Sequence, residues 1–173
     1  MTTTIQVGDQ GFWAPIDAFG AWMAYLVEEI ANRAPVMLDP ALGALAEQWR
    51  VAAVVTDYGA DAGDLSAEER AALRSIAAAA RTRAETVGDL TADQMRKWII
   101  LDDHPVAGGW AAHGTVELTR ILEVAGGFIA LLDGEFPPDP PAGAWFLGGG
   151  NGFEVVPYRP DALTKPRWSR HKS

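Results

Sequence analysis

The sequence predicts a mainly α fold: a bundle-like domain of about five helices, with a C-terminal β-hairpin and a short N-terminal strand. Three observations lead to this class. Apolar residues recur every three or four positions in several long segments, which is the period of an α-helix. Two capping boxes, Ser66 to Glu69 and Thr91 to Gln94, mark helix starts. An Asn-Gly pair at 151–152 stands between two short β-like runs, as in a hairpin.

The N-terminal part of the chain predicts a strand and two helices. Residues 2–7 are rich in β-branched side chains and precede a turn with two glycines, which favours a short strand. Pro15 suits the first position of a helix, and the apolar stripe that follows it has helical spacing. Asp39 and Pro40 combine an N-cap with a first helical residue, so a second helix begins here and ends before Gly59.

Two further helices follow the capping boxes. The first is alanine-rich and closes at Gly88. Its arginines are expected on the outer, solvated sides; they are Arg70, Arg74, Arg81 and Arg83. The second helix is short, with apolar residues up to Leu101. Asp102 and Asp103 are therefore expected at its C-terminal end.

The fifth helix is predicted from Val116 to about Asp133. Its apolar positions follow one helix face, and Gly134 stands where a left-handed residue often ends a helix. At about 100° per residue, Glu117 projects beside that face and Arg120 points away from it.

A proline-rich connector and a hairpin complete the predicted fold. Residues 137–141 include four prolines and cannot be helical. The hairpin strands are predicted at 144–147 and 153–156, on either side of the glycine-rich stretch 148–152. Because no helix begins after this stretch, we interpret it as a turn and not as a phosphate-binding loop.

Charge divides the chain into two unequal parts. The formal net charge is −9, while residues 159–173 carry five basic residues and one acidic residue, a net of +4. Residues 1–158 therefore carry 9 − 22 = −13. We expect one domain over 1–158, with its hairpin at 144–158, and a flexible basic tail over 159–173. The acidic body argues against nucleic-acid binding.

The remaining composition suggests where the protein resides. There is no cysteine, the first residues lack the pattern of a signal peptide, and no apolar stretch is long enough to span a membrane. We therefore expect a cytoplasmic protein, bound to neither membrane nor nucleic acid.

Two histidines and an adjacent aspartate pair form the best candidate site. Histidine titrates near neutrality, and a neighbouring carboxylate can orient it and stabilise its cation. The predicted catalytic residues are Asp102, Asp103, His104 and His113. The residues expected to bind a substrate are Glu117, Trp110, Asp57 and Tyr58. In the alternative interpretation these are structural residues, with Asp103 capping a turn and His113 bonded to a backbone carbonyl. No cofactor and no metal ion is assigned.

Two functions follow from these observations. The first is a small-molecule enzyme that uses Asp/His general acid–base chemistry in an interhelical pocket, as an isomerase, cyclase, lyase or hydrolase. The second is a non-catalytic acidic binding protein, such as an immunity or antitoxin-like partner of a basic protein. Histidines that point into a closed pocket would favour the enzyme. Exposed histidines and an acidic face with aromatic residues would favour the binding protein.

Overall fold

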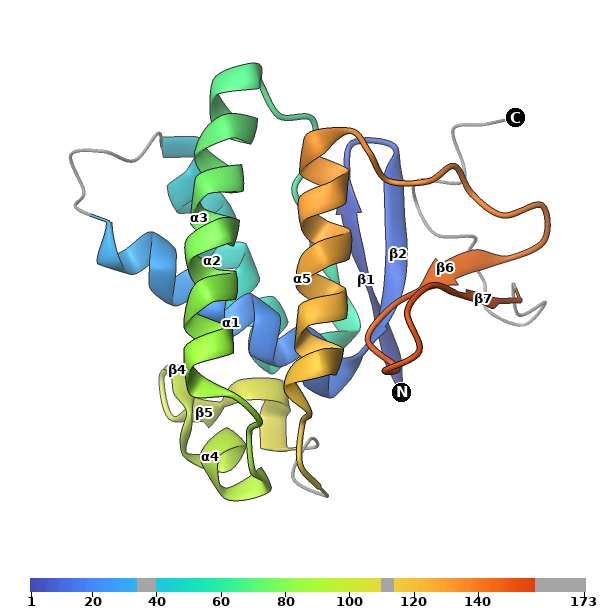
Figure 1. Ribbon diagram of the computed structural model, residues 1–173. Coiled ribbons are helices and arrows are strands. Elements are labelled where there is room, and N and C mark those ends of the chain that lie inside the picture. The colour runs from blue at the N-terminus through green and yellow to red at the C-terminus, as the bar shows by residue number, and fades with distance from the viewer. Residues whose placement is uncertain (34–39, 110–113, 158–173) are drawn as a thin grey trace.

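A computed structural model describes residues 1–33, 40–109 and 114–157 of the chain. It has a mixed α/β fold, in which helices pack on a five-stranded sheet (Figure 1). The helices are α1 (Ile16–Asn32), α2 (Pro40–Val54), α3 (Ala67–Val87), α4 (Ala92–Lys97) and α5 (Leu118–Asp133). Five helices were expected in these regions, but the predicted mainly α class is wrong because the sheet is a full layer of the structure.

The sheet combines strands from the two ends of the described chain with β3, which lies between them in the sequence. Its order is β3-β1-β2-β6-β7. The strands are β1 (Thr2–Val7), β2 (Gln10–Pro15), β3 (Ala60–Asp61), β6 (Ala144–Phe146) and β7 (Glu154–Val156). The pairs β1–β2 and β6–β7 are antiparallel, whereas β3 runs parallel to β1 and β6 runs parallel to β2.

The fold class was predicted wrongly because the sequence of β2 does not look like that of a strand. Its residues, QGFWAP, contain a glycine and a proline, which are rare in strands. Its partner Phe146 pairs with Trp13 from the far end of the chain. Local periodicity carries no information about such a long-range pairing. The C-terminal hairpin is therefore part of the main sheet and not a separate unit at one end of a bundle.

Helix α1 lies at the centre of the molecule. Ten consecutive residues, Ala18 to Val27, are buried, so the helix is enclosed on all sides and is not a surface helix with one apolar stripe. It contacts α2, α3 and α5 as well as strands β1 and β2. Trp22 packs edge-to-face on Phe128 of α5, and Trp49 of α2 packs on the same ring. The core therefore lies between the helices and the sheet.

Helices α3 and α5 lie side by side in front of α1 and run in opposite directions (Figure 1). Both predicted capping boxes are confirmed, at the starts of α3 and α4. Gly134 has a left-handed backbone and ends α5 as expected. The glycine at 127 allows α5 to approach the sheet, because an added Cβ would lie 2.4 Å from Leu147 Cδ1.

The predicted helix up to Leu101 is shorter in the structure. Helix α4 ends at Lys97, and Ile99–Leu101 forms strand β4, which pairs with β5 (His104–Pro105) in a small separate hairpin. A short 3-10 helix, η3 (Val106–Gly109), follows it. Among the described residues, no helix is long and apolar enough to cross a membrane.

Candidate functional site

The structure places three of the predicted catalytic residues on the β4–β5 hairpin. Asp102 and Asp103 form its turn, not a helix end, and Asp102 has a left-handed backbone with φ 49°. His104 Nε2 lies 3.6 Å from Asp103 Oδ1. The two side chains are 61% and 93% exposed. Asp103 and His104 are thus brought together, but in solvent and not in a pocket.

The other predicted residues do not join this group. Glu117 precedes α5 as its N-cap residue and is exposed, without a side-chain capping bond. Asp57 and Tyr58 belong to the 3-10 helix η2 (Thr56–Tyr58) and are exposed too. Within the described ranges, no hydrogen bond or ion pair links Glu117, Asp57 or Tyr58 to the hairpin. Two other predicted site residues, Trp110 and His113, lie outside the residues that the structure describes, as does the predicted tail 159–173.

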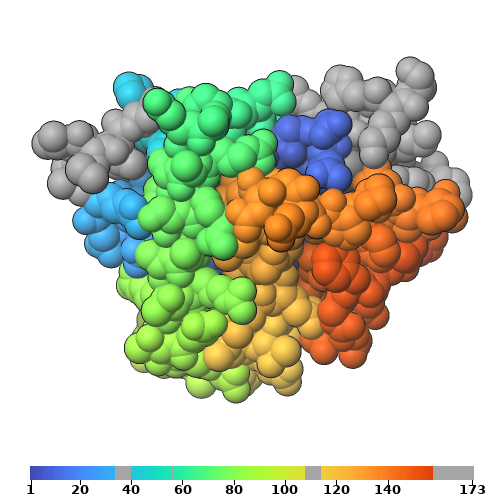
Figure 2. All heavy atoms as spheres, turned by 45° about the horizontal axis from the view of Figure 1, so that its top comes forward, coloured from blue at the N-terminus to red at the C-terminus, as the bar shows by residue number. Residues whose placement is uncertain are grey.

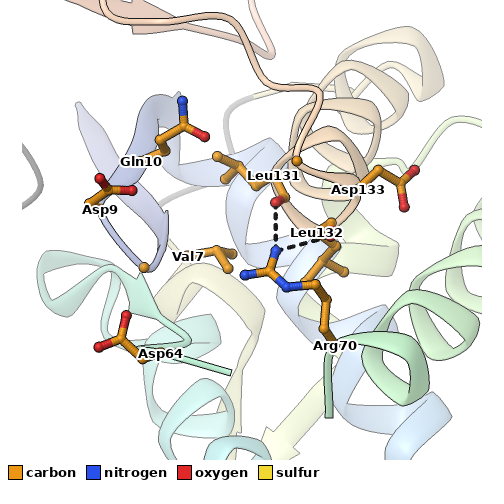
Figure 3. A pocket seen from close by; sticks show the side chains of 10 residues that line it. Val7, Asp9, Gln10, Asp64, Arg70, Leu131, Leu132 and Asp133 are labelled. Atoms are coloured by element: carbon orange, nitrogen blue, oxygen red, sulfur yellow. Dashed lines mark hydrogen bonds between the residues drawn. The ribbon is translucent and has the colours of Figure 1, made fainter. Parts of the chain in front are cut away.

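A cleft of about 530 Å³ lies at the opposite end of the molecule, next to the β1–β2 turn (Figure 3). Four segments line it: the β1–β2 turn with its flanking residues, the loop between β3 and α3, the first turn of α3, and the end of α5. Its lining residues are Val7, Gly8, Asp9, Gln10, Asp64, Arg70, Leu131, Leu132, Asp133 and Gly134. Its volume is in the range of small-ligand sites, about 300–1,000 Å³. None of the predicted site residues lines it.

The segments around the cleft are strongly acidic. We define the acidic end as residues 8–10, 61–70 and 131–135. It contains one basic residue, Arg70, against seven carboxylates: Asp9, Asp61, Asp64, Glu68, Glu69, Asp133 and Glu135. Figure 2 shows the start of α3, the β1–β2 turn and the end of α5 close together on one face. The charge of the acidic body is therefore concentrated where the cleft opens.

Backbone hydrogen bonds hold the rim of the cleft in place. The Gly8 N–H donates to the Gly63 carbonyl at 2.9 Å, and the Gly63 N–H donates to Asp61 Oδ1 at 2.8 Å. Both glycines have left-handed backbones, with φ near 60°. The parallel pairing of β1 with β3 thus brings Asp64 beside the β1–β2 turn. A Cβ added to Gly8 would lie 3.6 Å from Asp64 Oδ1.

On the opposite wall of the cleft, the charged side chains are paired with other groups of the protein. Arg70 Nη1 donates to the carbonyl oxygens of Leu131 and Leu132, both at 3.0 Å, in the last turn of α5 (Figure 3). A cation is favourable at this end of a helix. Asp133 is turned away from Asp9 and Asp64 and accepts hydrogen bonds from Arg74 Nε at 2.9 and 3.1 Å. The sequence suggested that the arginines of α3 are solvated. Arg70 and Arg74 instead bind groups at the end of α5.

Asp9 and Asp64 differ from these paired groups. Both are exposed, and neither forms a hydrogen bond or an ion pair through its carboxylate in the described part of the chain. They lie on the same wall of the cleft, across from Arg70 (Figure 3). No group of three or more histidine or carboxylate side chains among the described residues could hold a metal ion. The free carboxylates are suited to bind an organic cation, such as a lysine or arginine side chain.

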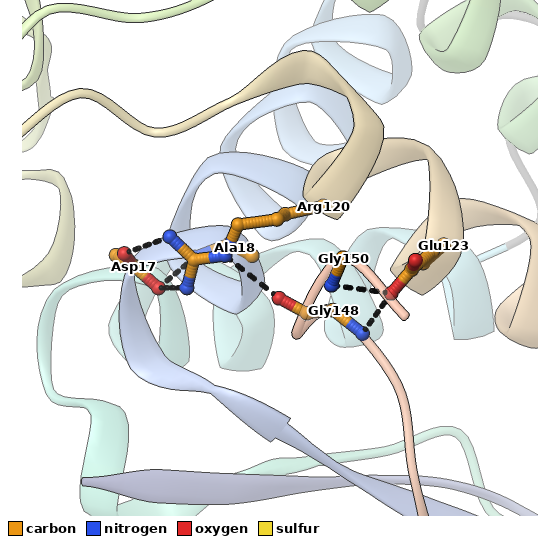
Figure 4. Close-up of polar contacts among 6 residues, drawn as sticks. All are labelled: Asp17, Ala18, Arg120, Glu123, Gly148 and Gly150. Atoms are coloured by element: carbon orange, nitrogen blue, oxygen red, sulfur yellow. Dashed lines mark hydrogen bonds and ion pairs between the residues drawn. The ribbon is translucent and has the colours of Figure 1, made fainter. Parts of the chain in front are cut away.

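The glycine-rich stretch 148–152 binds a carboxylate of its own chain (Figure 4). Gly148 and Gly150 donate their N–H groups to Glu123 Oε2 at 2.9 and 3.0 Å, and Gly152 donates to Oε1 at 2.8 Å. The stretch is thus a turn between β6 and β7, as expected, and also a nest of N–H groups around an anion. Since Glu123 fills this nest, the geometry gives no room to an external phosphate.

Arg120, which was expected to point away from the apolar face of α5, is paired inside the structure. Its guanidinium makes a bidentate pair with Asp17 at 2.7 and 2.8 Å (Figure 4). Its Nε donates to the Gly148 carbonyl at 2.8 Å. Arg120 and Glu123 interrupt the apolar pattern of α5, and that interruption was the available signal. Their partners lie 103 and 25–29 residues away, so the sequence could not name them.

A second polar cluster joins α1, α3 and Trp98, the residue that follows α4. Trp98 Nε1 donates to Glu28 Oε1 at 2.7 Å, and Arg83 Nη2 lies 2.7 Å from Glu28 Oε2. Tyr25 packs edge-to-face on Trp98 and is only 2% exposed. Burial raises the pKa of the Tyr25 phenol; the charge of Arg83 opposes this shift, and that of Glu28 adds to it. This cluster attaches the segment before the hairpin to the central helix.

Comparisons with protein family models, with curated proteins and with solved structures find no match to this chain. Sequence reasoning missed Asp9 and Asp64 because each looks like an ordinary turn residue, and only the β1–β3 pairing unites them.

Proposed function

We propose that this protein is a non-catalytic binding protein whose acidic end recognises a basic protein partner, as immunity or antitoxin-like proteins do. The observation that carries this proposal is the pair of unpaired carboxylates, Asp9 and Asp64, on a rim held by backbone hydrogen bonds. Seven carboxylates and one arginine lie in the surrounding segments, and Arg74, just outside them, pairs with Asp133, so this end keeps a net negative charge. A net charge of this sign steers a basic partner towards the site.

The geometry favours this function over proton-transfer catalysis. A general acid or base acts within hydrogen-bonding distance of a bound substrate, and a site that excludes water strengthens the effect. His104 is 61% exposed at the tip of a hairpin, and the cleft is lined by none of the residues predicted to be catalytic. The enzyme hypothesis therefore draws no support from the described residues.

Two double variants test the proposal. Both remove two negative charges, but at different places on the molecule. Asp9→Asn/Asp64→Asn removes both free carboxylates from the rim without changing side-chain size. Asp102→Asn/Asp103→Asn is the matched control, because it removes two adjacent exposed carboxylates at the opposite end of the molecule (Figure 1). Wild-type protein and both variants are used to retain proteins from an extract of the native host, and the retained partner is then titrated by calorimetry.

We expect the wild type and the Asp102/Asp103 variant to retain the same protein, with a pI above about 9. The Asp9/Asp64 variant should bind it about tenfold to a hundredfold more weakly, which corresponds to about 1.4–2.7 kcal/mol. Affinity should also fall as the salt concentration rises from about 0.05 to 0.5 M. Retention of an acidic partner, or equal affinities for the two variants, would contradict the proposal.

A further inference from the structure

The end of α2 and the short helix η2 that follows it carry apolar side chains that the fold does not bury. Val51, Val55 and Tyr58 are 38%, 41% and 78% exposed. Val51 lies in α2, Val55 directly follows it, and Tyr58 ends η2. The Val55 N–H donates to the Val51 carbonyl at 2.7 Å and the Tyr58 N–H donates to the Val55 carbonyl at 3.3 Å, so the helical turns continue and the three side chains follow each other on one side. We name these three residues the α2 stripe.

The α2 stripe differs from the exposed side of the other long helix at the surface. Along its length, α3 exposes small or polar residues, among them Ser75, Thr82 and Glu85, and its one exposed valine, Val87, is its last residue. The inner face of α2 is already occupied, since Trp49 and Ala53 are buried in the core. The stripe is therefore additional to what packing of α2 requires. Exposed apolar groups that form a row, and tyrosine in particular, are typical of protein interfaces.

The charges next to the stripe indicate what kind of partner fits it. Residues 40–61 carry three carboxylates and one arginine: Glu47, Asp57, Asp61 and Arg50. Arg50 lies 3.7 Å from Glu47, so its charge is partly compensated within the helix. An apolar row with an acidic border complements an apolar patch with a basic border. A partner with such a patch carries positive charge, as does the partner that the acidic end attracts.

The stripe also leads directly to the acidic end along the chain. Tyr58 is followed by β3, whose Asp61 belongs to the acidic end, and Asp64 comes six residues after Tyr58. A standard interface covers about 800 Å² on each partner, with about 20–30 residues. One partner can therefore contact both regions.

We propose that the α2 stripe docks an apolar patch, bordered by basic residues, on the same protein that the acidic end binds. This inference rests on the proposed function. The acidic end then supplies attraction and orientation, and the stripe supplies the apolar contact that distinguishes the true partner from other basic proteins.

Two peptides test the stripe separately from the charges. Both have about 18 residues, enough for an amphipathic helix. The first contains lysine on one face and leucine on the other, and the second has the same lysines with serine in place of leucine. Binding of each is measured by fluorescence anisotropy. The variants are Val51→Ser/Val55→Ser and, as matched control, Val87→Ser/Val155→Ser, which removes two slightly more exposed valines elsewhere.

We expect the wild type and the control variant to bind the leucine peptide at least about tenfold more tightly than the serine peptide. Val51→Ser/Val55→Ser should reduce this ratio to below about threefold, with an unchanged thermal midpoint because both valines are exposed. An unchanged ratio in that variant, or an equal reduction in the control, would overturn the inference. If Asp9→Asn/Asp64→Asn left the affinity for the serine peptide unchanged, the proposed function itself would fail, whatever the stripe does.

Discussion

Tyr25 shows how one residue can be placed in the core at a cost. Its hydroxyl is buried and has no hydrogen-bond partner among the described residues. An unsatisfied buried polar group costs about 1–3 kcal/mol. The aromatic contact with Trp98 keeps the ring in place, and the burial that this requires raises the pKa of the phenol. The residue therefore links packing to stability at alkaline pH.

Tyr25→Phe tests this link. The folded protein favours the protonated phenol, so the wild type has its full stability below the ordinary tyrosine pKa of about 10 and loses stability as the pH rises above it. We expect Tyr25→Phe to unfold at an equal or higher urea concentration than the wild type at pH 7. Its free energy of unfolding should be higher by up to about 1 kcal/mol. The relevant range is pH 9 to 11, about one unit on either side of that pKa. Over this range the free energy of unfolding should fall less in the variant than in the wild type.

Tyr58→Phe is the control for Tyr25→Phe. Tyr58 is 78% exposed, so its replacement leaves the buried phenol in place. This variant should keep the alkaline loss of the wild type. If Tyr25→Phe and the wild type had the same pH profile, Tyr25 would not be the group responsible.

At the scale of elements, the contact between α5 and the β6–β7 loop depends on Glu123. Its carboxylate accepts three backbone N–H groups, and hydrogen bonds to charged groups contribute about 1.5–3 kcal/mol each before exposure is considered. We expect Glu123→Ala to lower the free energy of unfolding by about 2–4 kcal/mol. Glu123→Gln keeps one acceptor oxygen and should lose about half as much.

Amide hydrogen exchange and urea unfolding check this prediction together. Gly148, Gly150 and Gly152 should exchange faster in Glu123→Ala, because their N–H groups lose their acceptor. Glu117→Ala, at the start of the same helix and without a side-chain capping bond, should change neither measurement. Unchanged glycine exchange in Glu123→Ala would show that the carboxylate does not hold the loop.

The elements also show what the sequence can and cannot predict. Both capping boxes were predicted, because each depends on residues three apart whose types suffice. The Gly134 helix end was predicted for the same local reason. Strand β2 was missed, since its assignment depends on pairing with β1 and with Phe146. The helix before Asp102 was extended too far because Ile99 and Leu101 continue an apolar pattern that two periods fit equally well.

The candidate site followed the same rule at larger separation. Asp103 and His104 were predicted to be neighbours, and they are, since they are adjacent in sequence. Asp9 and Asp64 are 55 residues apart and meet only through the parallel β1–β3 pair. The bidentate pair of Asp17 and Arg120 spans 103 residues. Sequence patterns report residue types and local spacing, whereas these contacts depend on the topology.

At the scale of the whole molecule, the structure separates its polar groups by place. The β4–β5 hairpin lies at one end, and the turn between β1 and β2 lies at the other (Figure 1). The hairpin carries Asp102, Asp103 and His104, and the turn borders the cleft with Asp9 and Asp64. Between these two ends, the central helix α1 contacts both the other long helices and the sheet. The acidic end is therefore a feature of the assembled fold, because three separate segments supply its charges. The central claim is that a basic protein partner binds there.

Hydrogen–deuterium exchange of the protein alone and in complex with its purified basic partner tests this claim most directly. We expect slower exchange on binding in residues 8–10, 61–70 and 131–135, and unchanged exchange in 99–105. Exchange reports opening and solvent access of the backbone, so an interface over the acidic end slows it there. Protection confined to 99–105, with the acidic end unchanged, would contradict the account.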